Sequence, residues 1–281
     1  MSSKQKIIYL GPEGTFAFCT AEKRFAGQYE FVPATTIRGV FDGVSKDRLS
    51  LGVVPIENSS GGTIYETVNQ LVDQSFGLFI QESLSMNVKL ALLGKNKEGI
   101  QVIYSHFAPL VHCENWLRSK FPNAQLSEEK STATAVLRAS KEENTAAIGT
   151  RDAAKKYNLT VLEFPIGEEN MQNITQFFVV GHEKALLRPG DNLKTSFVVV
   201  LPNEPGGVVN FLEPFKDEKI NLSRIISRPI WGQPESYVFL IDILGTEQEE
   251  KVKVAVEKAG KVAISMKNIG SYPTTEAYAS E

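Results

Sequence analysis

A glycine-rich turn that carries a carboxamide and a hydroxyl gives the first indication of chemistry. It follows an apolar run over residues 51–56 that is typical of a buried strand, and apolar residues at helical spacing come after it. Asn58 and Ser59 supply side-chain hydrogen bonds, while Gly61 and Gly62 let a ligand approach backbone N–H groups at the start of a helix. The pattern predicts a seat for a carboxylate. An ordinary Asn/Ser helix cap fits the same residues, so both interpretations stay open.

A second pair of hydroxyl residues, Ser131 and Thr132, begins another predicted helix that runs to about Lys141. A helix N-terminus presents unpaired N–H groups and a partial positive charge, so this start also suits an anion. We expect it to face the Asn58 turn across a cleft, where two helix ends would converge on one anionic ligand. Routine capping is again the alternative.

Two further segments are weaker candidates. Residues 11–16, Gly-Pro-Glu-Gly-Thr-Phe, lie between a short strand and a helix, but they lack the Gly-Lys-Ser/Thr ending of a nucleotide-binding P-loop. Thr175 lies where a polar segment enters an apolar strand, and a lone threonine in such a place is usually structural. Neither segment identifies a reaction by itself.

Charge and composition exclude several function classes. The 281-residue chain has a formal net charge of −3 and a sequence pI near 5.8, so no nucleic-acid partner is expected. Its apolar segments are too short to predict a membrane span. The two cysteines favour a reducing, cytoplasmic location. His106, His112 and His182 lack zinc-ligand spacing, so we expect surface or locally bonded histidines and no metal.

Strands alternate with helices in the first part of the chain. This order favours an α/β fold with a mostly parallel sheet and a ligand at the carboxyl ends of its strands. Residues 1–182 are expected to form one domain of two subdomains. Subdomain A comprises about 1–85 and 166–182, and subdomain B, about 86–165, is inserted into it.

A polar stretch over residues 184–194 with a Pro-Gly pair predicts an interdomain linker. The remaining residues, 195–281, show strand and helix patterns in the order βαββαβ, which is ferredoxin-like. The first strand-to-helix loop of this unit contains Gly206 and Gly207, where a small molecule or a partner backbone can approach closely. Residues 271–281 are expected to be a frayed tail.

Several of these segments occur in the order and at the spacing of a known family. They are residues 11–16, 55–59 with Gly61 or Gly62, 131–133, Asn173 with Thr175 and Phe177, 220–222, 227–229 and the strand 237–242. On these motifs the chain resembles the prephenate dehydratase family over nearly its whole length, with a catalytic domain followed by a C-terminal ACT regulatory domain.

The resemblance implies an enzyme that removes carbon dioxide and water from prephenate to give phenylpyruvate in phenylalanine biosynthesis. It implies a catalytic domain with a periplasmic-binding-protein-like pair of subdomains, and an ACT domain that binds phenylalanine as a feedback inhibitor. It implies neither a metal nor an organic cofactor. Because ACT domains commonly pair through their sheets, a homodimer or homotetramer is expected.

The resemblance also assigns roles to individual residues. Thr175 is the expected catalytic residue, which hydrogen-bonds or protonates the leaving hydroxyl. The expected substrate-binding residues are Thr15, Glu57, Asn58, Ser59, Gly61, Gly62, Ser131, Thr132, Asn173, Gln176 and Phe177. The expected phenylalanine-binding residues are Gly206, Gly207, Val208, Ser227, Arg228 and Pro229.

Two substitutions depart from the family pattern at informative places. The Thr-Arg-Phe signature reads Thr-Gln-Phe here, with Gln176 in the middle, and the glutamate that usually precedes Ser-Arg-Pro is Ile226. A neutral amide in place of a guanidinium removes a positive charge that favours binding of a dianionic substrate. Lys89 or Arg151 would restore this charge if its side chain faces the cleft. An arogenate dehydratase and a non-catalytic ligand-binding paralogue therefore remain as alternatives.

Overall fold

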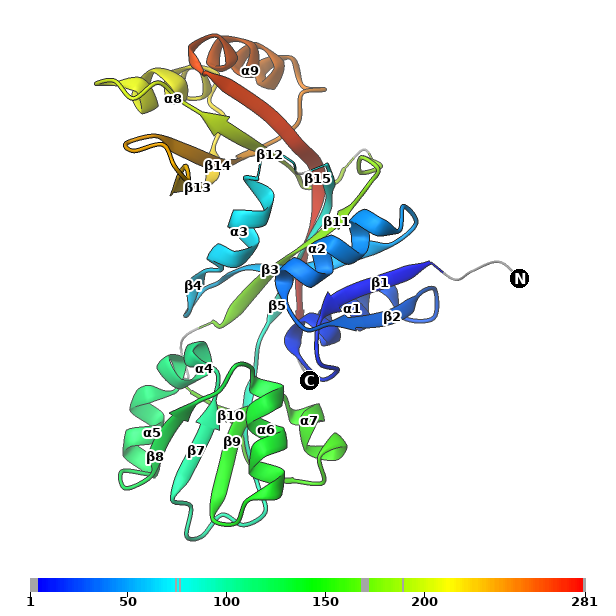
Figure 1. The fold of residues 1–281 in the computed structure, drawn as a ribbon, viewed down its shortest axis with the longest axis vertical. Coiled ribbons are helices and arrows are strands. Elements are labelled where there is room, and N and C mark those ends of the chain that lie inside the picture. The colour runs from blue at the N-terminus through cyan, green and yellow to red at the C-terminus, as the bar shows by residue number, and fades with distance from the viewer. Residues whose placement is uncertain (1–4, 74, 76, 168–171, 189, 280–281) are drawn as a thin grey trace.

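The computed structural model describes residues 5–279 apart from 74, 76, 168–171 and 189. Its strands form two sheets, and the elements divide into a first lobe, a second lobe and a C-terminal unit (Figure 1). The first lobe lies in the middle of the long axis, with the second lobe at one end and the C-terminal unit at the other. No helix among the described residues has the length and apolar character to cross a membrane.

The first lobe combines a mixed sheet with helices. Its strands are β1 (Lys6–Leu10), β2 (Glu30–Ala34), β3 (Leu51–Asn58), β4 (Gly62–Thr63), β5 (Phe79–Asn87) and β11 (Ile174–Gly181), and its helices are α1 (Phe16–Phe25), α2 (Ile37–Lys46) and α3 (Tyr65–Leu71). β1 pairs in parallel with β2 and β3, whereas β11 runs antiparallel between β3 and β5. The chain therefore returns from the second lobe into the centre of this sheet.

The second lobe is a five-stranded sheet with four helices. Its strands are β6 (Leu90–Gly94), β7 (Val102–Ser105), β8 (Gln125–Glu128), β9 (Thr145–Gly149) and β10 (Thr160–Ile166), and its helices are α4 (Phe107–His112), α5 (Glu114–Lys120), α6 (Thr132–Lys141) and α7 (Arg151–Lys156). The strand order is β10-β6-β9-β7-β8. Helix α4 ends at His112 and α5 begins at Glu114, so Cys113 separates the two helices.

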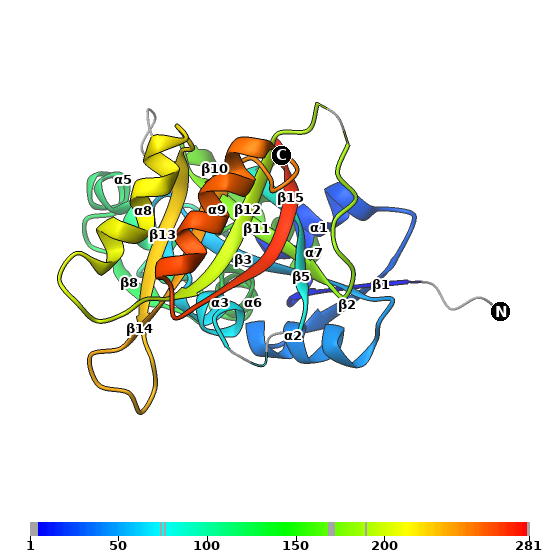
Figure 2. The ribbon, with the colours of Figure 1, turned by 90° about the horizontal axis from the view of Figure 1, so that it is seen from above.

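The C-terminal unit has the βαββαβ order that the sequence predicts. Its elements are β12 (Leu193–Val200), α8 (Gly207–Asp217), β13 (Leu222–Pro229), β14 (Tyr237–Leu244), α9 (Glu250–Val262) and β15 (Ser265–Ala279). The strand order β13-β14-β12-β15 is that of a ferredoxin-like sheet, and α8 and α9 lie side by side on one of its faces (Figure 2). The predicted α/β class is confirmed, but both lobes have mixed sheets, so the expectation of a mostly parallel sheet is wrong.

Strand β15 corrects the expected frayed tail. Its first part pairs with β12 and its last part runs in parallel beside β5, so the C-terminal sheet and the first-lobe sheet are continuous. Tyr272 is fully buried, and its ring centre is 5.6 Å from that of Phe178 in β11. The segment is polar and has no clear apolar period, so its pairing with β5 is visible only in the fold.

Both faces of the first-lobe sheet are buried, which explains why β3 and β11 are almost continuously apolar. One face packs toward the second lobe in a core that contains Val53, Phe177 and Ile103. The other face packs in a core with Phe178 and residues of the C-terminal unit such as Leu240. Successive residues of β11 therefore face different parts of the molecule.

Candidate active site

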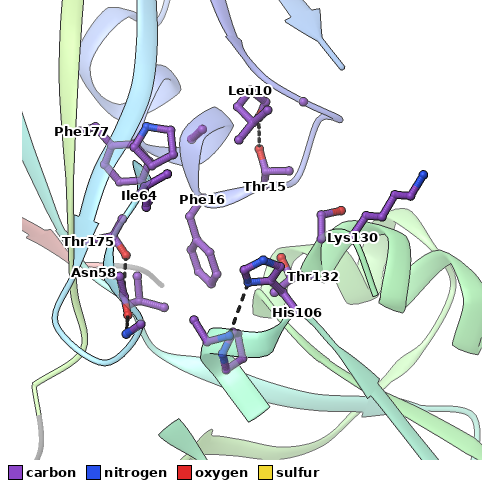
Figure 3. A pocket seen from close by; sticks show the side chains of 18 of the residues that line it. Leu10, Thr15, Phe16, Asn58, Ile64, His106, Lys130, Thr132, Thr175 and Phe177 are labelled. Atoms are coloured by element: carbon purple, nitrogen blue, oxygen red, sulfur yellow. Dashed lines mark hydrogen bonds between the residues drawn. The ribbon is translucent and has the colours of Figure 1, made fainter. Parts of the chain in front are cut away.

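A cavity of about 570 Å³ lies between the first and second lobes. Its wall is mainly apolar, with a few polar groups that converge from β3, β11, α1 and the start of α6 (Figure 3). The polar and predicted site residues in this wall include Thr15, Asn58, Gly61, Gly62, His106, Lys130, Ser131, Thr132, Asn173, Thr175 and Phe177. The structure thus brings together most of the substrate-binding residues that the sequence predicts.

Three polar side chains from adjacent strand ends form a hydrogen-bonded group in the cavity wall. Asn58 Nδ2 donates to Thr175 Oγ1 at 2.9 Å and to Asn173 Oδ1 at 2.7 Å. Asn58 Oδ1 accepts from the backbone N–H groups of Ser60 and Gly61 at 3.0 and 2.7 Å. Because a carboxamide oxygen can only accept, these two backbone donors fix its orientation and direct Nδ2 at Thr175.

The Thr175 hydroxyl retains a proton to donate. The residue is 8% exposed, and its oxygen accepts the Asn58 hydrogen bond. Within the part of the chain that the structure describes, this hydroxyl donates to no protein acceptor. A hydroxyl has one donor besides its acceptor lone pairs, so a ligand in the cavity is the natural acceptor for this proton.

Two helices direct their N-termini at the cavity. Thr15 caps α1 by accepting a hydrogen bond from the N–H three residues later at 3.2 Å, and Ser131 caps α6 in the same way at 3.1 Å. Each helix is ten residues long, and Phe16 and Thr132 from their first turns line the cavity. The unpaired N–H groups and positive dipole end of each helix favour an anion there.

Among the described residues that line the cavity, Lys130 is the only lysine or arginine. It is exposed, and Figure 3 shows it on the wall opposite Thr175, with its ammonium group directed away from Thr175. His106 lies in the same wall, where desolvation lowers its pKa, so its ring is neutral near pH 7. Lys89 and Arg151 do not line the cavity, and the Arg151 guanidinium lies over a phenylalanine ring at 4.8 Å. Sequence reasoning missed Lys130, although it directly precedes the capping Ser131.

Comparison with known proteins identifies the family. The model of the family described as prephenate dehydratase matches residues 7–185, which is more than half of the chain. The chain belongs to the prephenate dehydratase family. The prephenate dehydratase of Methanocaldococcus jannaschii is 31% identical over 95% of this chain and 97% of that protein. The bifunctional chorismate mutase/prephenate dehydratase of Pseudomonas aeruginosa is 35% identical over 95% of this chain and 73% of that protein.

Solved structures agree with this membership. The prephenate dehydratase of Arthrobacter aurescens, determined in complex with L-Phe, has a TM-score of 0.85 and 27% identity, covering 95% of this chain and 90% of that chain. The quorum-quenching acylase GqqA has a TM-score of 0.83 at 20% identity over 96% of this chain, which shows the fold alone. The predicted family, the fold class and the assignment as a dehydratase, a lyase, are confirmed.

Three residues expected to bind substrate lie outside the cavity of this prephenate dehydratase family member. Gln176 Oε1 and Glu57 Oε2 instead accept hydrogen bonds from Arg224 Nη2 of β13, at 2.8 and 3.0 Å. Side chains of neighbouring strand residues point to opposite faces, so Gln176 cannot share the side of Thr175. Ser59 closes its turn onto β11, where its hydroxyl donates to the carbonyl of residue 172 and accepts from the N–H of residue 174, both at 2.9 Å.

The turn after β3 also differs from the expected helix cap. The strand β4 follows it, and α3 begins at Tyr65 without a side-chain cap. The N–H of Gly61 is already bonded to Asn58, so it is not available to a carboxylate. A Cβ on Gly61 would lie 2.8 Å from the Cβ of Ala108, so this glycine permits close approach of the two lobes. The capped helix starts in the cavity wall are therefore those of α1 and α6.

The predicted phenylalanine-binding residues all lie in the C-terminal unit. Gly206 has a φ of +84°, and a Cβ on Gly207 would lie 2.8 Å from the carbonyl oxygen of Pro202, so the local backbone requires both glycines. Arg228 Nε donates to Asn69 Oδ1 at 2.8 Å, which ties it to α3. Val208, Ser227 and Pro229 are exposed. Their role in binding an effector stays a prediction.

His112 corrects the expectation of surface or locally bonded histidines. It is buried, and its Nδ1 lies 2.9 Å from the hydroxyl of Ser60, so it links α4 of the second lobe to the turn of the first. Among the described residues, no group of three or more His, Cys, Asp or Glu side chains is arranged to hold a metal ion.

Proposed function

We propose that the protein catalyses the decarboxylating dehydration of prephenate to phenylpyruvate, with Thr175 as the catalytic residue. The observation that carries this proposal is the hydrogen bonding of the Thr175 hydroxyl. The Thr175 oxygen accepts a hydrogen bond from Asn58, so the hydroxyl proton of Thr175 can be donated to a ligand in the cavity. Two helix N-termini face the same cavity. Family membership supports the same reaction.

The chemistry needs positioned anion sites and one proton. The bond between the ring and its carboxylate breaks, and its electron pair enters the ring as carbon dioxide leaves. The electrons that complete the aromatic ring expel the 4-hydroxyl, which leaves as water after it takes a proton. Thr175 donates a hydrogen bond to this oxygen. A threonine hydroxyl is too weak an acid to stay ionised, so Thr175 regains the proton that it gives to the leaving oxygen from a water or from the substrate.

The two helix N-termini supply the sites for the two carboxylates. The start of α6, with Ser131 and Thr132, and the start of α1, with Thr15 at its cap, lie on different walls of the cavity. Two fixed anion sites hold the substrate so that its leaving groups meet the correct side chains. Asn173 and Phe177 complete the wall beside Thr175.

The charge of the cavity favours prephenate over arogenate. Arogenate carries an ammonium group where prephenate has a ketone, and a buried ammonium needs a carboxylate or several acceptors. No Asp or Glu occurs among the described residues that line the cavity, whereas Lys130 is present. A dianion without an ammonium group therefore fits this wall better.

We further propose that residues 1–182 act as the catalytic domain and residues 195–281 as an ACT domain that binds phenylalanine as a feedback inhibitor. The ferredoxin-like strand order of the C-terminal unit supports this, as does the L-Phe complex of the Arthrobacter aurescens relative. A homodimer or homotetramer in the cytoplasm completes the proposal, since β13 is an edge strand of the sheet and its Ile225 is exposed.

Purified protein incubated with prephenate and, separately, with arogenate tests the function. We expect phenylpyruvate from prephenate, at least tenfold slower turnover of arogenate, and inhibition when phenylalanine is added. Absence of phenylpyruvate in the presence of calorimetric prephenate binding would instead support a non-catalytic paralogue. Faster turnover of arogenate would contradict the preference argued from the cavity.

A further inference from the structure

A partly buried ionic cluster lies behind the cavity, on the face of the first-lobe sheet that packs against the C-terminal unit. At its centre is Arg224 of β13, whose side chain is 6% exposed. Its guanidinium donates to Asp242 Oδ2 at 2.5 Å, to Glu57 Oε2 at 3.0 Å and to Gln176 Oε1 at 2.8 Å. It also lies over Phe178, 5.2 Å from the ring centre. The cluster therefore joins β3 and β11 of the first lobe to β13 and β14.

Two members of this cluster are chain neighbours of the proposed catalytic pair. Glu57 and Gln176 are directly opposite each other in β3 and β11, and the next cross-strand pair is Asn58 with Thr175. Side chains alternate along a strand, so the first pair faces Arg224 and the second faces the cavity. Arg224 thus holds both strands one residue away from the Thr175 hydroxyl.

The strand pair is irregular at this place. Gln176 is opposite Glu57, but Phe177 is opposite Pro55, so the register shifts and Ile56 has no opposite residue in β11. A bulge interrupts the hydrogen-bond ladder between β3 and β11, while β4 and β5 still pair with the outer edges of these two strands. The side-chain bonds from Arg224 to Glu57 and Gln176 connect β3 and β11 where the ladder between them is interrupted.

A purely stabilising role does not account for all the contacts of Arg224. Arg224 and Asp242 already form a complete buried ion pair between neighbouring strands of the C-terminal unit. The bonds to Glu57 and Gln176 leave that unit, and the Glu57 side chain is 45% exposed, so this ion pair adds little stability. Ile226, two residues after Arg224 in β13, packs an apolar side chain against the core that contains Phe178 and Leu240. An apolar residue is therefore compatible with this interface.

We propose that Arg224 is a positioning residue for the reaction, which acts through Glu57 and Gln176 on the geometry of Asn58 and Thr175. This inference rests on the proposed function, because it assigns the Thr175 hydroxyl a role in turnover. It also means that the C-terminal unit contributes directly to the active site, through a side chain that never contacts the substrate.

Variants at positions 57 and 176 test this inference without breaking the buried ion pair. Glu57→Leu, Gln176→Leu and the double variant leave Arg224 paired with Asp242 but remove its bonds to β3 and β11. We expect kcat for prephenate to fall at least tenfold in the double variant, because small displacements of a catalytic group reduce rates strongly. KM should stay within about threefold, since neither side chain lines the cavity.

Two comparisons separate positioning from general loosening. Glu57→Gln keeps an acceptor for Arg224 and should retain more of kcat than Glu57→Leu. Asn69→Ala removes a hydrogen bond from β13 to the first lobe that is made by Arg228 and not by Arg224, and it should leave kcat within about twofold. Circular dichroism and melting curves establish that each variant is folded at the assay temperature.

Arg224→Met completes a mutant cycle. If Arg224 acts through its two partners, adding this substitution to the Glu57→Leu/Gln176→Leu variant changes log kcat little. If Arg224→Met does not fold, the double variant decides. This inference is overturned if the folded double variant keeps full kcat, or if its kcat changes no more than that of Asn69→Ala. In that case, turnover of prephenate by the wild type still supports the proposed function. A wild type without turnover overturns both.

Discussion

At the scale of single residues, the site depends on one carboxamide whose four hydrogen bonds are all assigned. Asn58 accepts two backbone N–H groups and donates to Asn173 and Thr175. The sequence context of Asn58 suggested that its carboxamide binds a carboxylate, but its four hydrogen bonds leave it no donor for that role. The carboxamide instead fixes the hydrogen bond that the Thr175 oxygen accepts.

Removal of the Thr175 hydroxyl should stop turnover without unfolding the protein. Thr175→Val keeps the shape of the side chain, and we expect kcat to fall by about 10²- to 10⁴-fold, the range for loss of a positioned proton donor. Thr175→Ser keeps the hydroxyl and should retain at least a tenth of wild-type kcat. The check is steady-state kinetics with prephenate. Equal losses in both variants would show that packing, not the hydroxyl, matters at this position.

Lys130 rather than position 176 should control the attraction of the dianion. Lys130→Met is expected to raise KM by about threefold to tenfold, with the difference shrinking as salt is added, because the side chain is exposed. Gln176→Arg should not lower KM, because this residue faces Arg224 on the other side of the sheet. Lys141→Met, at the far end of α6, is the matched control. A KM improved tenfold by Gln176→Arg would contradict the placement.

At the scale of elements, helix starts carry two functions at once. The hydroxyl caps of α1 and α6 satisfy backbone N–H groups, and the same helix ends face the cavity. Capping and anion binding, treated as alternatives in the sequence, are therefore compatible. A cap uses one of the unpaired N–H groups at a helix start and leaves others for a ligand.

Matched cap substitutions separate these two functions. Ser131→Ala and Thr36→Ala each remove an N-cap, of α6 and α2, and each should lower the free energy of unfolding by about 1 kcal/mol. Only Ser131→Ala should also raise KM, since Thr36 does not line the cavity. Urea denaturation and prephenate kinetics measure the two effects. Equal KM values in both variants would contradict an anion site at α6.

At the scale of the whole molecule, β15 makes the C-terminal unit and the first lobe one continuous sheet. Tyr272 lies at this junction, where its hydroxyl is 2.6 Å from that of Ser196, which in turn donates to Asp242. Through Asp242 this chain reaches Arg224 and the back of the catalytic strands. The C-terminal unit and the first lobe therefore share buried polar contacts as well as a sheet.

Tyr272→Phe should destabilise the protein by about 1–2 kcal/mol, because it removes the hydrogen bond to Ser196 in a buried site. Burial raises the pKa of Tyr272 well above 10, so only the unfolded state ionises this group just above pH 10. Wild-type stability therefore falls there as pH rises, and the gap to Tyr272→Phe should narrow. Urea denaturation between pH 7 and 11 checks this, with the exposed Tyr237→Phe as control.

The sequence could also have shown that the side chains of Thr175 and Gln176 lie on opposite faces of the sheet. Strand alternation alone predicts that these neighbours face opposite sides, yet the motif placed both at the substrate. What alternation cannot tell is which face is the cavity, because both faces of β11 are buried and equally apolar. The position of the C-terminal unit against one face resolves this.

Taken by itself, the sequence determined the family, the α/β class, the βαββαβ unit and the cap at Ser131, because these depend on local patterns and ordered motifs. Only the tertiary structure decided the course of β15, the entry of Lys130 into the cavity wall and the contact of Gln176 with Arg224. Each of these depends on segments far apart in the chain, and their mutual position is set by packing that no local pattern encodes.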